Sequence, residues 1–413
     1  MTVVAVDLWG RRVGAVSDES GLPAFEYDPD WRASGCSISP FHLPLERGVF
    51  SFPELRRQEG FLGMPGVFAD SLPDRFGNRV IRAHLASQGL ADSDITPAEK
   101  LLYVGARGMG ALEYQPAIAL HDSTEHIGLE LGALVAQARQ VIQRHVTSSI
   151  PDIMAAASSA GGVRAKALVG WRPGNDEIVA HAPDLPAGFQ HWIIKFDGMH
   201  EDGRPQHWTR LEFAYNEMAR AASVGVAQST LLGDGELAHF MSRRFDREGG
   251  RKIHLHSLCG MRHADYNEPR SWSYELYFRT CLGLGLGMDE LCEAFRRMVF
   301  NVVARNQDDH SKNVAFLKDD IESDWRLAPA FDVTYAHGAG WTLAHQMSVN
   351  GRFDAIGRED LDAVAELYGI RRRGEIIDEV REAVRRWPEF AERAELDAEV
   401  TARVGRDHDL LGD

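Results

Sequence analysis

Three polar residues in the last third of this 413-residue chain constrain its fold most strongly. Asp308 and Asn313 stand five residues apart in the run NQDDHSKN, and Asp332 ends a later run, LAPAFD. Carboxylate and amide oxygens are the ligands that Mg²⁺ prefers, and a further carboxylate can serve as a base. A polar turn at positions 308–310 would explain the first run by itself, but not the later residues. The pattern therefore predicts a fold that brings one base and two metal ligands together.

This spacing is typical of a phosphoryl-transfer site. In protein kinases an Asp orients the attacking hydroxyl, an Asn five residues later binds metal, and another Asp follows about twenty residues on. The protein then has little covalent chemistry to perform, because Mg²⁺ on the phosphates and an aligned nucleophile suffice. We therefore interpret Asp308 as the catalytic base and Asn313 and Asp332 as the Mg²⁺ ligands.

A glycine-rich run upstream, SSAGGVRAKALVGW at residues 158–171, is suited to holding phosphate. Exposed backbone N–H groups around the glycines can bind phosphate oxygens, and Arg164 and Lys166 add positive charge before a strand expected at Ala167–Trp171. The run is neither a GxxxxGK[ST] loop nor the GxGxxG of ordinary protein kinases. An ordinary glycine turn is the competing interpretation.

A lysine and a glutamate follow the glycine-rich run in kinase order. Lys195 interrupts an apolar strand expected at His191–Gly198, and a buried lysine needs a partner such as phosphate. Its alternative is a lysine on an edge strand that reaches water. Glu212 lies early in a helix expected over Thr209–Ala222, where it could pair with Lys195; its alternative is a surface carboxylate. We expect both to belong to the nucleotide site.

Periodicity and turn residues indicate an α+β chain with a small front domain. Strands are expected at 3–9, 13–16, 238–245 and 252–258, and helices at 129–145, 288–301, 358–368 and 374–387. GARGMG at 105–110 and LGLGLG at 282–287 are interpreted as a turn and a loop. We place the domain boundaries at 1–120, 121–245 and 246–413.

Composition excludes several classes of protein. A net charge of −16 argues against a chain that coats nucleic acid by itself. The four cysteines are far apart and form no CxxC pair, which argues against a zinc site and for a reducing compartment. No leader-like segment and no apolar run of about 18 residues are visible, so we expect a cytoplasmic protein without a membrane span.

Taken in order, these motifs resemble HipA-type serine/threonine kinases, the toxins of bacterial HipBA toxin–antitoxin pairs. FADSLPDRFGNRVI at 68–81 resembles the N-terminal motif of that family. GGVRAKALV, WIIKF, RRFDR, NQDDHSKN and APAFD resemble its kinase motifs, so the resemblance spans nearly the whole chain. It implies a two-lobed, protein-kinase-like α+β fold with a small N-terminal α/β subdomain and a mostly helical C-terminal lobe.

The resemblance also implies roles for individual residues. Asp308 would be the catalytic base, with Asn313 and Asp332 on Mg²⁺. The ATP-binding set would comprise Ala160, Gly161, Gly162, Val163, Arg164, Ala165, Lys166, Lys195, Glu212, Arg243, Arg244, Phe245, His310, Ser311, Lys312, Asn313 and Phe331, with 243–245 forming the strand that meets adenine. Ser158, or its neighbour Ser159, would be autophosphorylated.

The partners implied are an antitoxin of the helix-turn-helix type, operator DNA bound through it, and a protein substrate, for which the best-known family example is an aminoacyl-tRNA synthetase. Phosphorylation of that target would inhibit growth. Two other functions are compatible with the residues. One is a kinase-like enzyme acting on a small molecule or lipid, and the other is a catalytically silent regulatory module.

Overall fold

The computed structural model describes residues 2–18, 21–87, 89–91, 95–118, 128–143, 153, 164–180, 182, 184–200 and 203–412. The chain divides into two compact units. The first comprises residues 1–209, 229–256 and 318–323, and the second comprises 210–228, 257–317 and 324–413. Each unit is therefore assembled from segments that are distant in sequence.

The first unit begins with a five-stranded sheet in the order β4-β3-β2-β1-β5. Alternate residues of β1, namely Val4, Val6 and Leu8, are fully buried, as expected for a strand with one face on a core. The strands are β1 (Val3–Leu8), β2 (Arg11–Ser17), β3 (Ala24–Tyr27), β4 (Val49–Ser51) and β5 (Leu112–Gln115). The accompanying helices are α1 (Pro29–Arg32), η1 (Pro53–Arg57), α2 (Gly66–Ala69), α3 (Arg75–Ser87) and α4 (Pro97–Val104).

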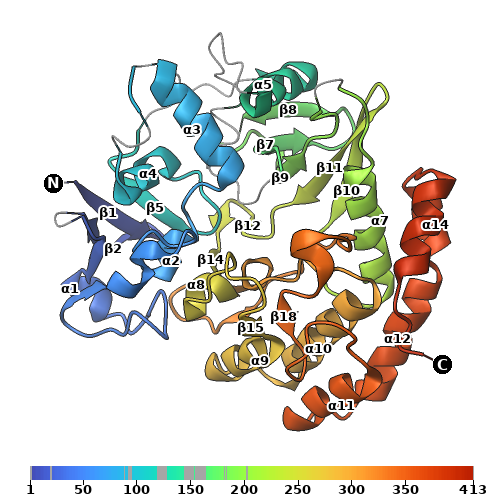
Figure 1. Cartoon of the computed structure of the whole chain (residues 1–413). Coiled ribbons are helices and arrows are strands. Elements are labelled where there is room, and N and C mark those ends of the chain that lie inside the picture. Colours follow the sequence, from blue (N-terminus) through green and yellow to red (C-terminus); the bar gives the residue numbers. More distant parts are fainter. Residues whose placement is uncertain are drawn as a thin grey trace. The chain divides into compact units, whose positions relative to one another are not determined.

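A six-stranded antiparallel sheet in the order β10-β11-β9-β7-β8-β6 completes most of the first unit (Figure 1). Its strands are β6 (Gly128–Leu129), β7 (Lys166–Arg172), β8 (Glu177–Ala180), β9 (Gln190–Lys195), β10 (Ser229–Asp234) and β11 (Leu237–Arg243). Helix α5 (Leu131–Gln143) packs its apolar residues, including Leu134 and Ala138, against Trp192 and Ile194 of β9, and Phe76 and Val80 of α3 join the same core. Short strands β12 (Arg247–Glu248), β13 (Arg251–Lys252) and β14 (His254–Ser257) follow.

The second unit is mostly helical. Its longest helix, α10 (Met288–Val303), packs against α9 and α12, which Figure 1 shows side by side with it. The helices are α7 (Trp208–Ala221), α8 (Leu258–Arg262), α9 (Tyr274–Gly283), α10, η3 (Ser311–Asn313), η4 (Gly340–Leu343), α11 (Arg358–Leu367), α12 (Arg373–Arg385), α13 (Trp387–Arg393) and α14 (Ala398–Asp407). Four short strands accompany them: β15 (Trp272–Ser273), β16 (Ala315–Lys318), β17 (Arg326–Leu327) and β18 (Met347–Ser348).

The predicted α+β fold class is confirmed, and most predicted elements are present with shifted ends. The helix expected over 374–387 is too long, because α12 ends at Arg385 and α13 begins at Trp387. Pro388 explains the break, since proline lacks the N–H group that would continue a helix but is tolerated in a first turn. The strand expected over 252–258 is divided between β13 and β14.

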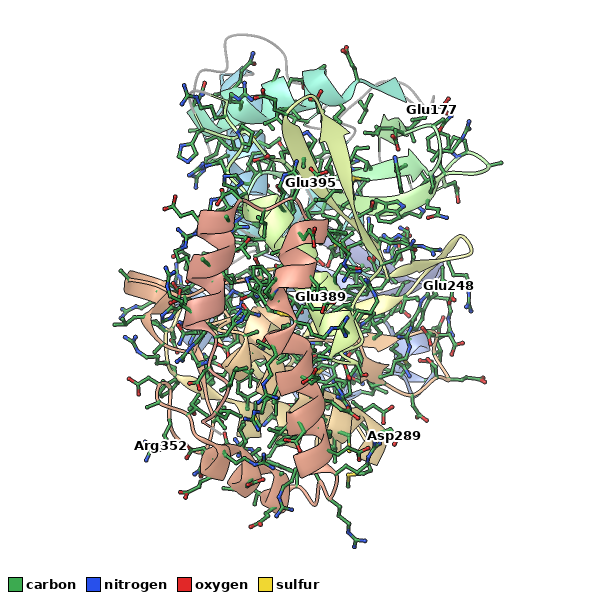
Figure 2. The ribbon with its side chains drawn as sticks, turned by 90° about the vertical axis from the view of Figure 1, so that its right-hand side faces the viewer. Glu177, Glu248, Asp289, Arg352, Glu389 and Glu395 are labelled. Atoms are coloured by element: carbon green, nitrogen blue, oxygen red, sulfur yellow. The ribbon has the colours of Figure 1, made fainter. Side chains whose placement is uncertain are left out.

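Negative charge is spread over separate elements. Figure 2 labels exposed acids on β8 (Glu177), β12 (Glu248), α10 (Asp289) and α13 (Glu389).

None of the four cysteines forms a disulfide. Among the described residues, no helix combines the length and the apolar character needed to cross a membrane.

Candidate functional site

The loop that carries Asp308 is fastened to the segment that follows Asp332. Helix α10 ends at Val303, and Arg305 takes a left-handed φ of 55°, which turns the chain out of the helix. The backbone of Gln307 then donates to the carbonyl of Ala336 at 2.9 Å, and Ala336 donates to the carbonyl of Arg305 at 3.2 Å. This short parallel pairing explains how two motifs distant in sequence come to share one site.

Asn313 is tied directly to Asp308. Its Nδ2 donates to the backbone carbonyl of Asp308 at 2.9 Å. Because the amide nitrogen is used in this way, the amide oxygen points elsewhere, as a metal ligand requires. Ser311, between them, is buried and donates its hydroxyl to the carbonyl of Ala264 at 2.6 Å, so its side chain anchors the loop. Any nucleotide contact from Ser311 would therefore involve its backbone.

The Asp308 carboxylate is half-buried and lies close to other polar groups. Trp341 donates its indole N–H to Oδ1 of Asp308 at 2.7 Å, and Nε2 of His310 lies 3.8 Å from the same oxygen. Burial raises the pKa of Asp308 above its usual value. The nearby His310 and the hydrogen bond from Trp341 act to lower that pKa, whereas the carboxylates of Asp332 and Asp309 act to raise it. The carboxylate is thus desolvated and positioned, as a general base should be.

Asp332 ends the APAFD run, in which Ala328 and Ala330 are buried. Its φ is 53°, a left-handed value that Asp tolerates better than most residues. The backbone on either side is fixed: Ala330 donates to the carbonyl of Gly225 at 2.7 Å, and Asn216 donates to the carbonyl of Val333 at 3.4 Å. These contacts fix the main chain around Asp332, which is half-buried. Its carboxylate lies near enough to Asp308 to contribute to the raised pKa of that residue.

The donor set fits Mg²⁺ better than a metal held only by protein. In the described part of the chain, no group of three or more His, Cys, Asp or Glu side chains could hold a metal ion. Mg²⁺ commonly takes one or two protein oxygens and completes its shell with water and phosphate oxygens. Asp332 and the amide oxygen of Asn313 would supply two such ligands.

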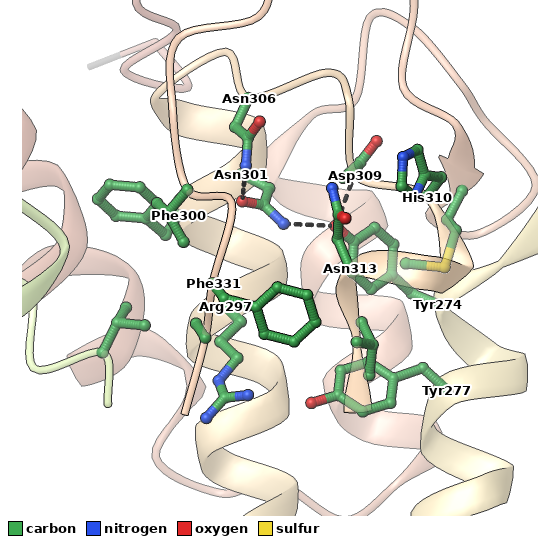
Figure 3. A pocket seen from close by; sticks show the side chains of 15 residues that line it. Tyr274, Tyr277, Arg297, Phe300, Asn301, Asn306, Asp309, His310, Asn313 and Phe331 are labelled. Atoms are coloured by element: carbon green, nitrogen blue, oxygen red, sulfur yellow. Dashed lines mark hydrogen bonds between the residues drawn. The ribbon is translucent and has the colours of Figure 1, made fainter. Parts of the chain in front are cut away.

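Asp309, the neighbour of Asp308, has a different environment. Its side chain is buried and accepts hydrogen bonds from the Tyr274 hydroxyl at 2.7 Å, from Nδ1 of His345 at 2.8 Å and from the backbone N–H of Gln346 at 2.8 Å. Figure 3 shows this network continuing through Asn301 to Asn306. A cavity of about 30 Å³, lined in part by Tyr274, Asn301, Asn306 and Asp309 of this network, is water-sized and too small for a nucleotide. Asp309 therefore anchors the loop of residues 306–313 to neighbouring segments through its hydrogen bonds.

Lys195 lies where the sequence pattern placed it. It ends β9, which runs between β7 and β11, so the alternative of an edge-strand lysine is wrong. Its ammonium lies 5.6 Å from the centroid of the Phe240 ring. Glu212 is 1% exposed, so the alternative of a surface carboxylate is wrong as well. Since the two residues belong to different units, their pairing stays a prediction.

The two cations expected beside the glycine-rich run differ from one another. Arg164 is exposed, and its guanidinium lies 5.1 Å from the ring centroid of Trp208. Lys166 is only 4% exposed, and its ammonium lies 3.6 Å from the Asp74 carboxylate, which the FADSLPD motif supplies. Lys166 therefore ties the start of β7 to the residue that precedes α3. The predicted residues Ser158, Ser159, Ala160, Gly161, Gly162 and Val163 lie outside the described residues.

The strand expected to meet adenine ends in a buried charge cluster. Arg244 and Arg247 both donate to Asp246, with shortest distances of 2.6 and 2.8 Å, and both reach the carbonyl of Gly108 at 2.9 Å. Arg243 is exposed and Phe245 half-buried. Since the Arg244 side chain is committed to the cluster, adenine contacts from Arg244 would have to come from its backbone.

Sequence reasoning did not assign roles to Asp309, Tyr274, Trp341, His345 and Gln346. The doubled Asp in NQDDHSKN was the available signal, because two adjacent acids in one turn repel each other unless one is paired. No motif marks Trp341, which lies nine residues after Asp332 and reaches Asp308 only through the tertiary fold.

Two protein-family models match this chain. Residues 4–115 match the model of the HipA N-terminal domain, and residues 158–387 match that of the HipA-like C-terminal domain. The second match covers more than half of the chain. The chain belongs to the HipA family. This confirms the family that the order of the motifs predicted.

Individual relatives of this HipA-family chain are distant. A Sinorhizobium fredii protein, Y4dM, whose name describes it as a candidate kinase, is 25% identical over 231 residues. That match covers 52% of this chain and 54% of the relative, so the chain spans about half the length of the curated relative it matches.

Solved structures show the fold. HipA of Shewanella oneidensis MR-1, in complex with HipB and its operator DNA, aligns with a TM-score of 0.68 at 19% identity, covering 98% of this chain and 94% of that one. The predicted HipA-like fold is confirmed by this likeness. The Helicobacter pylori kinase CtkA aligns over 52% of this chain and 90% of that one, at 13% identity, and its TM-score of 0.32 does not establish a common fold.

Proposed function

We propose that this chain is an ATP- and Mg²⁺-dependent serine/threonine protein kinase, acting as the toxin of a toxin–antitoxin pair. The observation that carries the proposal is the gathering of Asp308, Asn313 and Asp332 within one compact unit, with Asn313 bonded to the loop of Asp308. Membership of the HipA family supports it.

In the proposed reaction, the oxygen of a Ser or Thr hydroxyl attacks the γ-phosphorus of ATP. A new oxygen–phosphorus bond forms, the bond from γ-phosphorus to the β–γ bridging oxygen breaks, and ADP leaves. Asp308 accepts the proton of the hydroxyl, while Asn313 and Asp332 would hold Mg²⁺, which neutralises charge on the phosphates. Lys195 and the glycine-rich run would bind the phosphates.

We further propose that the protein is cytoplasmic and binds a helix-turn-helix antitoxin and, through it, operator DNA. The solved Shewanella HipA is bound to HipB and operator DNA, which supports this part. The protein substrate would be of the aminoacyl-tRNA synthetase kind, and its phosphorylation would inhibit growth. Self-phosphorylation would fall on Ser158 or Ser159.

Asp308→Asn tests the catalytic assignment. The amide has the shape of the carboxylate but cannot accept the proton, so transfer of labelled phosphate from ATP should fall by roughly 10²–10⁴-fold. The thermal unfolding midpoint should change little, because Asp308 is only half-buried. Asp332→Ala should also abolish transfer through loss of Mg²⁺. Wild-type rates in either variant would defeat the assignment.

Phosphopeptide mass spectrometry tests self-modification. Wild-type protein incubated with Mg²⁺ and ATP should carry phosphate on Ser158 or Ser159, and the Asp308→Asn variant should carry none. Phosphate on both proteins, or only on distant residues, would show that the modification is not made by the chain itself at this run.

A further inference from the structure

Trp341 touches the residue assigned as the base. It belongs to η4, and its indole N–H donates to Oδ1 of Asp308 at 2.7 Å. A hydrogen bond to a carboxylate at this distance is charge-assisted and roughly twice as strong as a neutral one. The Trp341 side chain is 38% exposed, so packing of a core does not explain its position.

Because of this bond, the two oxygens of the Asp308 carboxylate have different surroundings. Oδ1 of Asp308 is taken by Trp341, with His310 3.8 Å away. Oδ2 accepts no hydrogen bond from the part of the chain that the structure describes. An aspartate that has one oxygen fixed by a donor loses rotation about its side-chain bonds, and the other oxygen keeps a defined direction. A base that accepts a proton from a bound hydroxyl needs this alignment.

Trp341 is itself held by Gln346, which is hydrogen-bonded in turn to Asp309. Nε2 of Gln346 donates to the carbonyl of Trp341 at 2.6 Å and to that of Ala344 at 3.0 Å. The backbone N–H of Gln346 donates to Oδ1 of the buried Asp309 at 2.8 Å. A closed path of contacts thus runs from Asp308 along the chain to Asp309, through Gln346 to Trp341, and back to Asp308.

We propose that Trp341 is a positioning residue for Asp308, and that Asp309 acts through Gln346 to hold Trp341 in place. The inference rests on the proposed kinase function. It gives the doubled Asp of this loop a division of roles, in which the first residue reacts and the second supports the group that orients it.

Substitution of Trp341 tests the inference. Trp341→Phe keeps a ring but removes the N–H donor. We expect kcat for phosphate transfer from labelled Mg-ATP, to the protein itself and to casein, to fall about tenfold, with KM for ATP unchanged within about twofold. Leu343→Ala is the matched control, because Leu343 lies in the same turn and is 63% exposed. The control should keep wild-type kinetics and the same unfolding midpoint.

The outcomes separate this inference from the proposed function. Wild-type protein that transfers no phosphate, or transfer that survives Asp308→Asn, would defeat the kinase proposal and this inference with it. Transfer that depends on Asp308 but is unaffected in Trp341→Phe would overturn only the positioning role.

A measurement without turnover completes the test. In protein labelled with 5-fluorotryptophan, the ¹⁹F signal of Trp341 is the one that disappears in Trp341→Phe. That signal should shift in Asp308→Ala, because the indole loses its acceptor, and should not shift in Asp354→Ala, which changes an exposed acid of the same unit. An unshifted signal in Asp308→Ala would show that the contact does not form in solution.

Discussion

At the residue scale, the two adjacent aspartates of the candidate site show how environment assigns different roles to identical side chains. Asp308 is half-buried, and its carboxylate accepts one hydrogen bond from the described residues, whereas Asp309 is buried and its carboxylate accepts three. A carboxylate with that many donors has its lone pairs committed to the protein and is poorly suited to proton transfer. In the proposed reaction, the other oxygen of Asp308 would accept the proton of the substrate hydroxyl.

Asp309→Asn is expected to weaken the fold. The amide offers an N–H₂ group where one carboxylate oxygen now accepts, so at least one buried donor among Tyr274, His345 and Gln346 loses its partner. The free energy of unfolding from urea titration should fall by about 1–3 kcal/mol. Asp354→Asn, an exposed change in the same unit, should alter it by less than about 0.5 kcal/mol. Equal stability of the two variants would contradict the buried network.

At the scale of elements, two ionic contacts of the first unit join parts that are distant in sequence. The cluster of Arg244, Asp246 and Arg247 follows β11 and reaches the glycine turn at 105–110, whose Gly110 N–H also donates to Asp246 at 2.7 Å. The sequence pattern correctly indicated a turn at GARGMG, in which Gly105 and Gly110 have positive φ values. It gave no sign that two arginines would be bound there.

Asp246→Asn should be strongly destabilising. Burial alone would raise the pKa of Asp246, but Arg244 and Arg247 hold it well below its usual range, so the group is ionised in the folded protein. The substitution removes the charge of the carboxylate to which both buried guanidinium groups donate, and a loss of about 3–5 kcal/mol in urea unfolding is expected. Glu248→Gln, in an exposed pair with Arg251, is the control and should have almost no effect. A mild effect of Asp246→Asn would mean that the cluster contributes little.

The contact between Asp74 and Lys166 gives a pH-dependent prediction. Burial raises the pKa of Asp74 to about 6, although Lys166 partly offsets the shift. Because the folded pKa lies above the unfolded value of about 3.9, the contribution of Asp74 to stability is present at low pH and is lost as pH rises through about 6. The stability of the wild type relative to Asp74→Asn should therefore fall between about pH 4 and pH 6.5.

Lys166→Met sharpens that measurement. Without the ammonium, the pKa of Asp74 should rise further, and the pH window should move upward. Stability curves measured by urea titration at a series of pH values would reveal the shift. Curves for wild type and Asp74→Asn that run parallel across this range would contradict the assignment of the titration to Asp74.

At the scale of the whole molecule, nucleotide binding should couple to folding. A ligand that binds only the folded chain stabilises it by RT ln(1 + [L]/Kd), which is about 2.7 kcal/mol at one hundred times Kd. Mg-ATP should therefore raise the unfolding midpoint of the wild type. Lys195→Ala should reduce that rise, because Lys195 is proposed to contact the phosphates. Arg251→Ala, which removes an exposed cation of the same unit, should keep it. An equal rise of the unfolding midpoint in both variants would show that Lys195 does not contact the nucleotide.

The sequence by itself determined the elements and the order of the chemical groups. Period-two and helical patterns report which residues face a core, so β1, β9, α5 and α10 were predicted close to their observed bounds. The motif order identified the family, and the spacing of Asp308, Asn313 and Asp332 singled out the candidate site. These features are local or follow the chain, and a sequence records them directly.

Only the tertiary structure decided which polar side chains are occupied by the protein itself. Lys166 faces Asp74, Arg244 faces Asp246, and Ser311 faces the carbonyl of Ala264. Trp341 reaches Asp308 across 33 positions of sequence. A buried polar group takes whichever partner the packed chain places beside it, and that depends on how elements fold back on each other. Residue type and spacing predict that such a group needs a partner, but they do not identify the partner.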